Sequence, residues 1–279
     1  QRNYIGETPS RAPRSSPWKT DAELLRKFFK EIGPGMSARD RRHVELGARC
    51  EEVMYFGEWP VCLDVVTDRQ GLVYGIGVAD DWDFEAAAGN AGFQVHAFDP
   101  SVSYMTNLSP NVTFRCWGLT GGHTVGTSSN ENHNNENLGY GKVEGPLATL
   151  LAIVEALGHE EQDIQVLKID CEGCEWSALA HLAQAAPHML QRVRQINLEL
   201  HFSANLQVST PEDLKNMATS VRLLRQHGFK PWFTFPNAYN YEGRHHHQPA
   251  VLLELGLYPS TCCFEVGFIR GGGEMLLRP

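Results

Sequence analysis

Two apolar runs in the second half of the sequence end in residues that could do chemistry. "VLKID" (166–170) ends in Asp170, and "INLELHF" (196–202) carries Glu199 and His201. Such runs are typical of buried strands. Strand residues two apart point to the same face, so the three side chains could converge if the strands are neighbours. An unperturbed imidazole titrates near neutral pH, which makes His201 a candidate general base.

The same three residues could instead bind a metal ion. Two carboxylates and an imidazole are suitable ligands for a divalent cation such as Mg²⁺ or Mn²⁺, with positions left for two substrate hydroxyls. Asp170, Glu199 and His201 are therefore predicted as the reaction centre, acting through a base or a cation. The plainer alternative is that Glu199 and His201 only hydrogen-bond loops at a sheet edge.

A glycine-rich turn in the first half indicates a cofactor site. "GLVYGIGV" (71–78) contains Gly75 and Gly77, and "FQVHAFDP" (93–100) places Asp99 where nucleotide-binding folds hold ribose hydroxyls. A dinucleotide fingerprint needs a third glycine at position 80, but four acids follow instead: Asp80, Asp81, Asp83 and Glu85. Carboxylates repel a pyrophosphate and attract a cation, which favours S-adenosylmethionine over NAD or ATP. Alternatively, these acids only stabilise a helix N-terminus.

The cysteines raise two separate questions. Cys171 and Cys174 form a C-x-x-C motif, but the acids beside them raise a thiol pKa, and a zinc site needs two further soft ligands. We therefore expect two packed thiols there, rather than redox or zinc chemistry. Cys50 and Cys62 could form a disulfide in an oxidising compartment and tie the N-terminal segment to the core.

Hydrophobic periodicity predicts alternating strands and helices. Strands are expected at 71–78, 93–100, 112–119, 164–170 and 193–202, and helices at 83–92, 147–158, 175–186 and 211–228. Two closing strands, at 229–237 and 261–270, are predicted to form a final antiparallel pair. This order indicates a mainly parallel sheet covered on both faces, with ligands bound beyond the carboxyl ends of its strands.

The chain divides into three predicted parts. Residues 1–17 are rich in Pro, Ser and Arg and are expected to form a flexible arm. Residues 18–60 are expected to form a helical cap, with one helix opening at Thr20 and a second over 37–47. Residues 61–279 hold the main domain, including a polar loop at 120–142.

The stretch "LKIDCEGCEWSAL" resembles the strand-four signature of FkbM-type methyltransferases, in particular their eukaryotic methyltransferase-like branch. "VYGIGVADDWDFEAAA", "VHAFDPS", "WGLTGG" and "LELHF" fall in the order that family shows, so the resemblance covers about residues 60–270. It implies an α/β, Rossmann-like class I methyltransferase with a seven-stranded, mainly parallel sheet. The implied activity is O-methylation of sugars or related hydroxylated compounds with S-adenosylmethionine.

The resemblance also assigns roles to residues. Gly75 and Gly77 would make room for the methionine part of the cofactor, Asp99 would hold the ribose, and Asp170 would lie near the transferred methyl group. Trp117 and Gly118 would border the adenine. The complete set of predicted cofactor-binding residues is Tyr74, Gly75, Gly77, Asp81, Glu85, Asp99, Pro100, Trp117, Gly118 and Asp170. The chain departs from the family pattern by carrying Cys171 and Cys174.

Charge and composition exclude some partners and leave alternatives. The net charge is −9, and Lys and Arg form no dense run, so nucleic acid is a poor partner. No run of about 18 apolar residues is present to span a membrane. A small-molecule or glycan acceptor is expected. The alternatives to methyl transfer are an NAD-dependent oxidoreductase and a non-catalytic binding module with the same fold. Asp80, in place of the third glycine of a dinucleotide fingerprint, disfavours the oxidoreductase.

Three features favour the secretory pathway, in particular the Golgi lumen, over the cytoplasm. Two glycosylation sequons begin at Asn107 and Asn111, as in a glycoprotein. The sequence begins with Gln1 rather than Met, as expected of a processed or trimmed chain. Cys50 and Cys62 are placed where a disulfide could form.

Overall fold

The computed structural model describes residues 17–32, 47–102, 109–122, 145–201, 211–236 and 263–270. The helices are α1 (Pro17–Ile32), α2 (Asp83–Asn90), α3 (Leu150–Ala156), α4 (Cys174–Ala185) and α5 (Pro211–Gln226), with short 3₁₀ turns at Leu63–Val65 and Pro187–Arg192. The strands are β1 (Val53–Phe56), β2 (Trp59–Cys62), β3 (Leu72–Ile76), β4 (Gln94–Phe98), β5 (Val112–Arg115), β6 (Gly118–Leu119), β7 (Leu147–Ala148), β8 (Ile164–Ile169), β9 (Val193–His201), β10 (Phe229–Pro236) and β11 (Cys263–Arg270).

Seven strands form the central sheet in the order β10-β11-β9-β8-β3-β4-β5. β3, β4, β5, β8 and β9 pair in parallel, whereas β11 runs antiparallel to both β9 and β10. The predicted Rossmann-like fold, with its seven strands and closing antiparallel pair, is confirmed. Because β3 and β8 lie between parallel neighbours and are covered on both faces, every residue of each is buried, which explains their nearly continuous apolar sequences.

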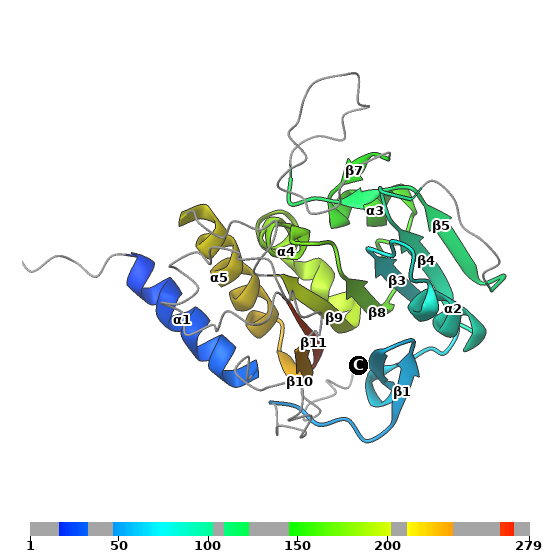
Figure 1. Cartoon of the computed structure of the whole chain (residues 1–279), viewed down its shortest axis with the longest axis horizontal. Helices are drawn as coiled ribbons and strands as arrows, with labels where there is room; N and C mark the ends of the chain where they lie inside the picture. The colour runs from blue at the N-terminus through cyan, green and yellow to red at the C-terminus, as the bar shows by residue number, and fades with distance from the viewer. Residues whose placement is uncertain are drawn as a thin grey trace, which may run out of the picture.

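The two faces of the sheet are covered differently (Figure 1). One face packs against α1, α3, α4 and α5 through a large apolar cluster that includes Phe29, Ile153, Leu179 and Val221. The other face packs against α2 and the β1–β2 hairpin through a smaller cluster around Phe56 and Phe84. In Figure 1 the hairpin lies beside α2, and α1 lies along α5.

A row of buried polar side chains runs along β9, from the β1–β2 hairpin to the carboxyl end of the strand. Gln195, Asn197, Glu199 and His201 are all buried and alternate along the strand. Gln195 Oε1 accepts the Cys62 N–H at 3.0 Å, and Asn197 Nδ2 donates to the Pro60 carbonyl at 3.0 Å. The hairpin thus pairs with the first two members of the row, and Glu199 and His201 remain at the carboxyl end.

The N-terminal region differs from the predicted helical cap. α1 begins at Pro17, three residues before the predicted opening at Thr20, and its apolar stripe belongs to the main core. Residues 53–62 form the β1–β2 hairpin, which the sequence analysis did not predict. The predicted second helix over 37–47 and the arm over 1–17 lie almost wholly outside the described residues. Among the helices described, none has the length and apolar character needed to cross a membrane.

Candidate active site

The carboxyl ends of β8 and β9 bring the three predicted residues together. Ile169 pairs with Leu198, so Asp170 emerges at the level of Glu199, and His201 follows two residues later. His201 Nε2 lies 3.9 Å from Asp170 Oδ1 and 3.9 Å from Glu199 Oε1. The parallel pairing of adjacent strands therefore produces the predicted convergence. The catalytic and metal-binding roles of these residues stay predictions.

Glu172 adds a third carboxylate that the predicted reaction centre lacked. Its Oε2 lies 3.6 Å from His201 Nε2, which makes it the nearest of the three acids. The backbone of Glu172 is left-handed, with φ of 54°, and this turns the side chain back toward β9. Burial raises the pKa of Glu172 above its usual value, although the charge of His201 opposes that effect.

Glu175 holds His201 from the opposite side. This carboxylate is fully buried in the first turn of α4, where the helix dipole favours negative charge. Its Oε1 accepts the backbone N–H of His201 at 2.8 Å and lies 3.2 Å from Nδ1. Its Oε2 accepts the Gly173 N–H at 3.0 Å. The sequence signal for Glu175 was an acid directly after a glycine turn and within an otherwise apolar helix.

The charges around His201 change the role predicted for it. Burial alone would lower the pKa of His201, but the charges of Glu175, Glu199 and Asp170 and the hydrogen bond with Glu175 raise it to about 10. At neutral pH the imidazole is therefore protonated in this arrangement. A protonated His201 cannot take a proton from a hydroxyl, so the base role predicted for it requires a further cation to offset the carboxylates.

Lys168 links the carboxylate cluster to the glycine turn. Its ammonium donates to the Gly77 carbonyl at 2.7 Å, lies 3.4 Å from Asp170 Oδ2, and is 5.4 Å from the centre of the Trp59 ring. Burial opposes the charge of Lys168, but Asp170 and Glu85 more than compensate and raise its pKa. The sequence analysis missed Lys168, whose signal was a single charge within the apolar run of β8.

The glycine turn after β3 fits tightly against β8. A Cβ on Gly77, whose φ is +78°, would lie 1.4 Å from the Asp170 carbonyl oxygen. A Cβ on Gly75 would lie 2.1 Å from a carboxylate oxygen of Glu85. Both positions therefore require glycine, for close backbone approach in the first case and for the Glu85 side chain in the second.

Glu85 is a buried carboxylate beneath this turn. Its side chain is fully buried in α2, and neither oxygen has a hydrogen-bond partner within the described residues. Burial raises the pKa of Glu85 to about 7, with Lys168 opposing the shift. An unpaired buried carboxylate beside two glycines suits a cationic ligand and disfavours a phosphate.

Asp99 organises the turn directly. Its Oδ2 accepts the backbone N–H groups of Val78 at 2.9 Å and Ala79 at 2.8 Å. Its Oδ1 accepts both the N–H and the hydroxyl of Ser101, at 2.7 and 2.5 Å. Ala79 has a left-handed backbone that these bonds help to stabilise. Ribose binding by Asp99 stays a prediction. The ribose hydroxyls would have to bind a carboxylate that already accepts hydrogen bonds from the turn.

The other predicted cofactor residues lie in different surroundings. Gly118 is buried against Pro100, since a Cβ there would lie 2.6 Å from Pro100 Cγ. Trp117 is half-buried, and its ring stacks on Phe98 with the ring centres 6.3 Å apart. Asp81 is exposed, and its Oδ1 accepts the Asp83 N–H at the start of α2. Roles in cofactor binding stay predictions for all of them.

Tyr74 faces away from the turn that follows it. Its side chain is fully buried, and its hydroxyl lies 2.7 Å from Nδ1 of His159. Only the backbone of Tyr74 is therefore available to a cofactor at the glycine turn.

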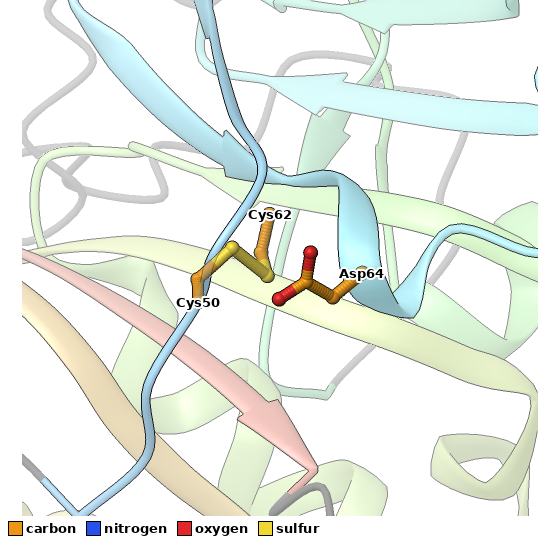
Figure 2. A group of neighbouring side chains, drawn as sticks. All are labelled: Cys50, Cys62 and Asp64. Atoms are coloured by element: carbon orange, nitrogen blue, oxygen red, sulfur yellow. A yellow bond between two sulfur atoms is a disulfide. The ribbon is translucent and has the colours of Figure 1, made fainter.

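The cysteine predictions have mixed outcomes. Cys50 and Cys62 form the predicted disulfide. Figure 2 shows the Asp64 carboxylate beside that bond, where it accepts the N–H groups of Glu51 and Glu52 at 2.7 and 3.0 Å. Because both thiols are oxidised, this group is not a metal site. The expectation of two packed thiols at Cys171 and Cys174 was wrong, since they too are joined by a disulfide.

Two groups at the carboxyl edge have the spacing of metal ligands. Asp170, Glu172 and His201 form one, and Glu199, His201 and Cys263 form the other. Cys263 is disulfide-bonded, so it offers no thiolate. Glu265 on β11 pairs directly with Glu199 and adds a further acid to the same face. A cation site at this edge would thus be composed of Asp170, Glu172, Glu199 and His201, which are hard oxygen ligands with one imidazole.

A family comparison agrees with this fold. Residues 49–246, well over half of the chain, match the family described as "Methyltransferase domain" (Methyltransf_22). The chain belongs to this methyltransferase family, and the predicted FkbM-type resemblance is confirmed.

Two curated relatives are similar over most of the chain. "Probable methyltransferase-like protein 24" of Rattus norvegicus is 25% identical over 272 residues, covering 92% of this chain and 68% of the relative. The human protein of the same name is 23% identical, covering 76% of this chain and 55% of the relative. A cyclopropane-fatty-acyl-phospholipid synthase-like protein from Lactobacillus casei covers 92% of this chain and 94% of its own, with 9% identity and a TM-score of 0.31. That score is too low to support an argument.

Proposed function

We propose that this protein is an S-adenosylmethionine-dependent O-methyltransferase that acts on a hydroxyl of a sugar, glycan or similar polyhydroxylated acceptor. The observation that carries the proposal is that the carboxylate cluster and the glycine turn lie at the same edge of the sheet. Three carboxylates surround His201 Nε2 there at 3.6 to 3.9 Å, and Lys168 connects Asp170 to the glycine turn. Family membership supplies the reaction class.

The residues of the glycine turn fit a cationic cofactor without phosphate. Gly75 and Gly77 leave no room for a side chain, and Glu85 places an unpaired carboxylate beneath them. Asp80, Asp81 and Asp83 surround the following turn and are exposed. This arrangement supports S-adenosylmethionine over NAD, because the carboxylates around this turn would repel a pyrophosphate.

The chemistry of O-methylation defines what the chain must provide. When bound, S-adenosylmethionine supplies a methyl group on a positively charged sulfur. The protein must align an acceptor hydroxyl with that group and remove its proton. A sugar hydroxyl is only weakly acidic, so it needs a base or a metal ion that lowers its pKa.

We propose that a divalent cation, Mg²⁺ or Mn²⁺, lowers the pKa of the acceptor hydroxyl and so helps to remove its proton. The cation would be held by Asp170, Glu172, Glu199 and His201. The four side chains come from two neighbouring strand ends and point into one space. Positive charge there would compensate the carboxylates and allow His201 to be neutral. Without the cation, the same carboxylates keep the imidazole of His201 protonated. Two adjacent acceptor hydroxyls could complete the coordination.

A secretory location, with the Golgi lumen favoured, forms part of the same proposal. The disulfides Cys50–Cys62 and Cys171–Cys174 persist in oxidising compartments and are rare in the cytosol of mesophiles. Asn111, the sequon asparagine within the described residues, is exposed directly before the edge strand β5, and its Nδ2 donates to the Gly89 carbonyl at 3.0 Å, a bond that a glycan would replace. Non-reducing peptide mass spectrometry of the protein from its native cells would test both the disulfides and a glycan on Asn111.

Calorimetry and turnover test the proposal. Wild-type protein is titrated with S-adenosylmethionine, NAD and Mn²⁺, and the variants are Asp170→Asn, His201→Ala and, as a control, Glu155→Gln at an exposed carboxylate on α3. We expect binding of S-adenosylmethionine but not NAD, and loss of Mn²⁺ binding in the first two variants only. A panel of sugars with labelled cofactor then identifies the acceptor.

Two results would contradict the proposal. If the folded wild-type protein fails to bind S-adenosylmethionine at millimolar concentration, the cofactor assignment is wrong. If turnover survives unchanged in both Asp170→Asn and His201→Ala, the reaction centre lies elsewhere.

A further inference from the structure

Glu175 contacts both the backbone and the ring of His201, and the predicted reaction centre did not include it. It lies in the first turn of α4 and is fully buried. A buried carboxylate is costly unless hydrogen bonds or charge compensate it. Within the described residues, the hydrogen-bond partners of Glu175 lie in two places, the turn after β8 and His201 at the end of β9.

The contacts with His201 fix the backbone and the ring together. Glu175 Oε1 accepts the backbone N–H at 2.8 Å and lies 3.2 Å from ring Nδ1. The neighbouring residue, Trp176, donates its Nε1–H to the backbone carbonyl of His201 at 3.2 Å. Glu175 and Trp176 thus bind the backbone N–H and the backbone carbonyl of His201, respectively. Of these two residues, Glu175 also contacts the imidazole.

The ring contact determines which nitrogen faces the carboxylate cluster. With Nδ1 donating to Glu175, ring nitrogen Nε2 points toward Asp170, Glu172 and Glu199. Carboxylates that accept from the far nitrogen of a metal-binding histidine set its tautomer and orientation and make it a better ligand. In the same way, Glu175 would keep the Nε2 lone pair available to a cation.

The other oxygen of Glu175 couples His201 to the turn that carries two of the acids. Oε2 accepts the Gly173 N–H at 3.0 Å and lies 3.5 Å from Sγ of Cys171. Gly173 and Glu172 both have left-handed backbones, so this turn has an unusual shape that needs such support. A single carboxylate therefore spans the two segments that form the cluster.

We propose that Glu175 is a positioning residue that orients His201 through Nδ1 so that Nε2 completes the cation site with Asp170, Glu172 and Glu199. This rests on the proposed function for the cation itself. Glu175 does not touch the cofactor, the acceptor or the cation, and acts only through His201 and the turn.

The test compares Glu175→Gln with Trp176→Phe. The Gln variant keeps the size of the side chain but loses the charge and one acceptor, because its NH₂ group faces N–H donors. The Phe variant loses the hydrogen bond to the backbone of His201 and part of a buried ring, but it leaves the carboxylate of Glu175 in place. Thermal unfolding, Mn²⁺ affinity, S-adenosylmethionine affinity and a crystal structure are recorded for each, and Glu175→Asp serves if the Gln variant does not fold.

We expect Glu175→Gln to lose about 10–100-fold in Mn²⁺ affinity, with cofactor affinity unchanged and the His201 ring turned in the crystal. Trp176→Phe should keep both the Mn²⁺ affinity and the ring orientation. With an acceptor in hand, the Gln variant should lose kcat rather than raise the KM for the cofactor.

The proposal is overturned if Glu175→Gln keeps the ring orientation and the wild-type Mn²⁺ affinity. It is also overturned if the two variants lose Mn²⁺ affinity equally, since that marks a structural role for the whole turn. If wild-type protein binds no Mn²⁺, the cation assignment fails by itself, and the ring orientation in the Gln variant still decides the role of Glu175.

Discussion

At the scale of single residues, Glu85 gives the clearest dependence of stability on pH. Burial raises its folded pKa from 4.5 to about 7. Between these two values the unfolded chain has released a proton that the folded chain still holds. Folding stability contributed by Glu85 is therefore full below about pH 4.5 and falls as the pH rises toward 7.

We predict that Glu85→Gln is stabilised relative to wild type at pH 8 by about 2 kcal/mol more than at pH 5, because the Gln variant has no buried charge to form. Urea denaturation at the two pH values measures this difference. Glu155→Gln, at an exposed position on α3, is the control and should show no such change. An equal effect of Glu85→Gln at both pH values would contradict the raised pKa.

Gly77 tests the close approach between the glycine turn and β8. Alanine there would combine a left-handed backbone with a Cβ 1.4 Å from the Asp170 carbonyl oxygen. We expect Gly77→Ala to cost about 2–5 kcal/mol and to abolish cofactor binding, because the turn must move away from Asp170.

Gly158 is the matched control for Gly77. It has a similar φ, +68°, but a Cβ there would meet nothing within 4 Å. Gly158→Ala should therefore cost only about 1 kcal/mol from backbone strain and leave cofactor binding intact. Equal costs at the two positions, measured by chemical denaturation, would show that the contact with Asp170 is not tight.

At the scale of elements, the two disulfides serve different parts of the molecule. Cys171 and Cys174 are 3 residues apart, and Cys50 and Cys62 are 12 apart. Loop-closure entropy gives about 2 kcal/mol for the shorter loop and about 3 kcal/mol for the longer one. The short disulfide, however, encloses Glu172 and Gly173 within the candidate active site.

We predict that the two double alanine variants differ in Mn²⁺ binding. Removing Cys171 and Cys174 should reduce Mn²⁺ binding and turnover strongly while lowering stability by about 2 kcal/mol. Removing Cys50 and Cys62 should lower stability more and leave Mn²⁺ binding unchanged. Unchanged Mn²⁺ binding after loss of the Cys171–Cys174 bond would mean that Glu172 reaches its position without it.

The elements of the main sheet could be predicted from the sequence because their signals are strong. Runs such as "IQVLKI" and "VRQINLEL" are buried on both faces. A glycine or proline follows each helix within two residues. The convergence of Asp170, Glu199 and His201 followed from strand order alone. The β1–β2 hairpin was missed because four-residue strands in "VMYF" and "WPVC" carry too little periodicity to be distinguished from a loop.

The parts of the site that escaped prediction depend on tertiary packing. Glu172 reaches His201 only because its own backbone is left-handed, which no periodicity reveals. Glu175 and Lys168 are charges in apolar elements, and each has a partner distant in the sequence, His201 on β9 for Glu175 and Gly77 after β3 for Lys168. The disulfide of Cys171 and Cys174 likewise depends on the tight turn between β8 and α4, which brings the two thiols together.

At the scale of the whole molecule, α1 belongs to the main domain rather than to a separable cap. Leu25, Phe28, Phe29 and Ile32 are buried in the same apolar cluster as the sheet and α5. Arg225 forms an ion pair with Glu31 at 2.7 Å, and Arg222 pairs with Asp21, so both ends of α1 are tied to α5. The predicted boundary at residue 60 therefore crosses a continuous core.

This packing predicts a single cooperative unfolding transition that includes α1. Phe29→Ala removes a ring that is 1% exposed and should cost about 3–5 kcal/mol, whereas Lys27→Ala, on the exposed side of the same helix, should cost almost nothing. Chemical denaturation followed by both tryptophan fluorescence and far-ultraviolet circular dichroism measures the change. If α1 were an independent cap, Phe29→Ala would instead produce an early transition in circular dichroism alone and leave the main transition and cofactor binding where they are in wild type.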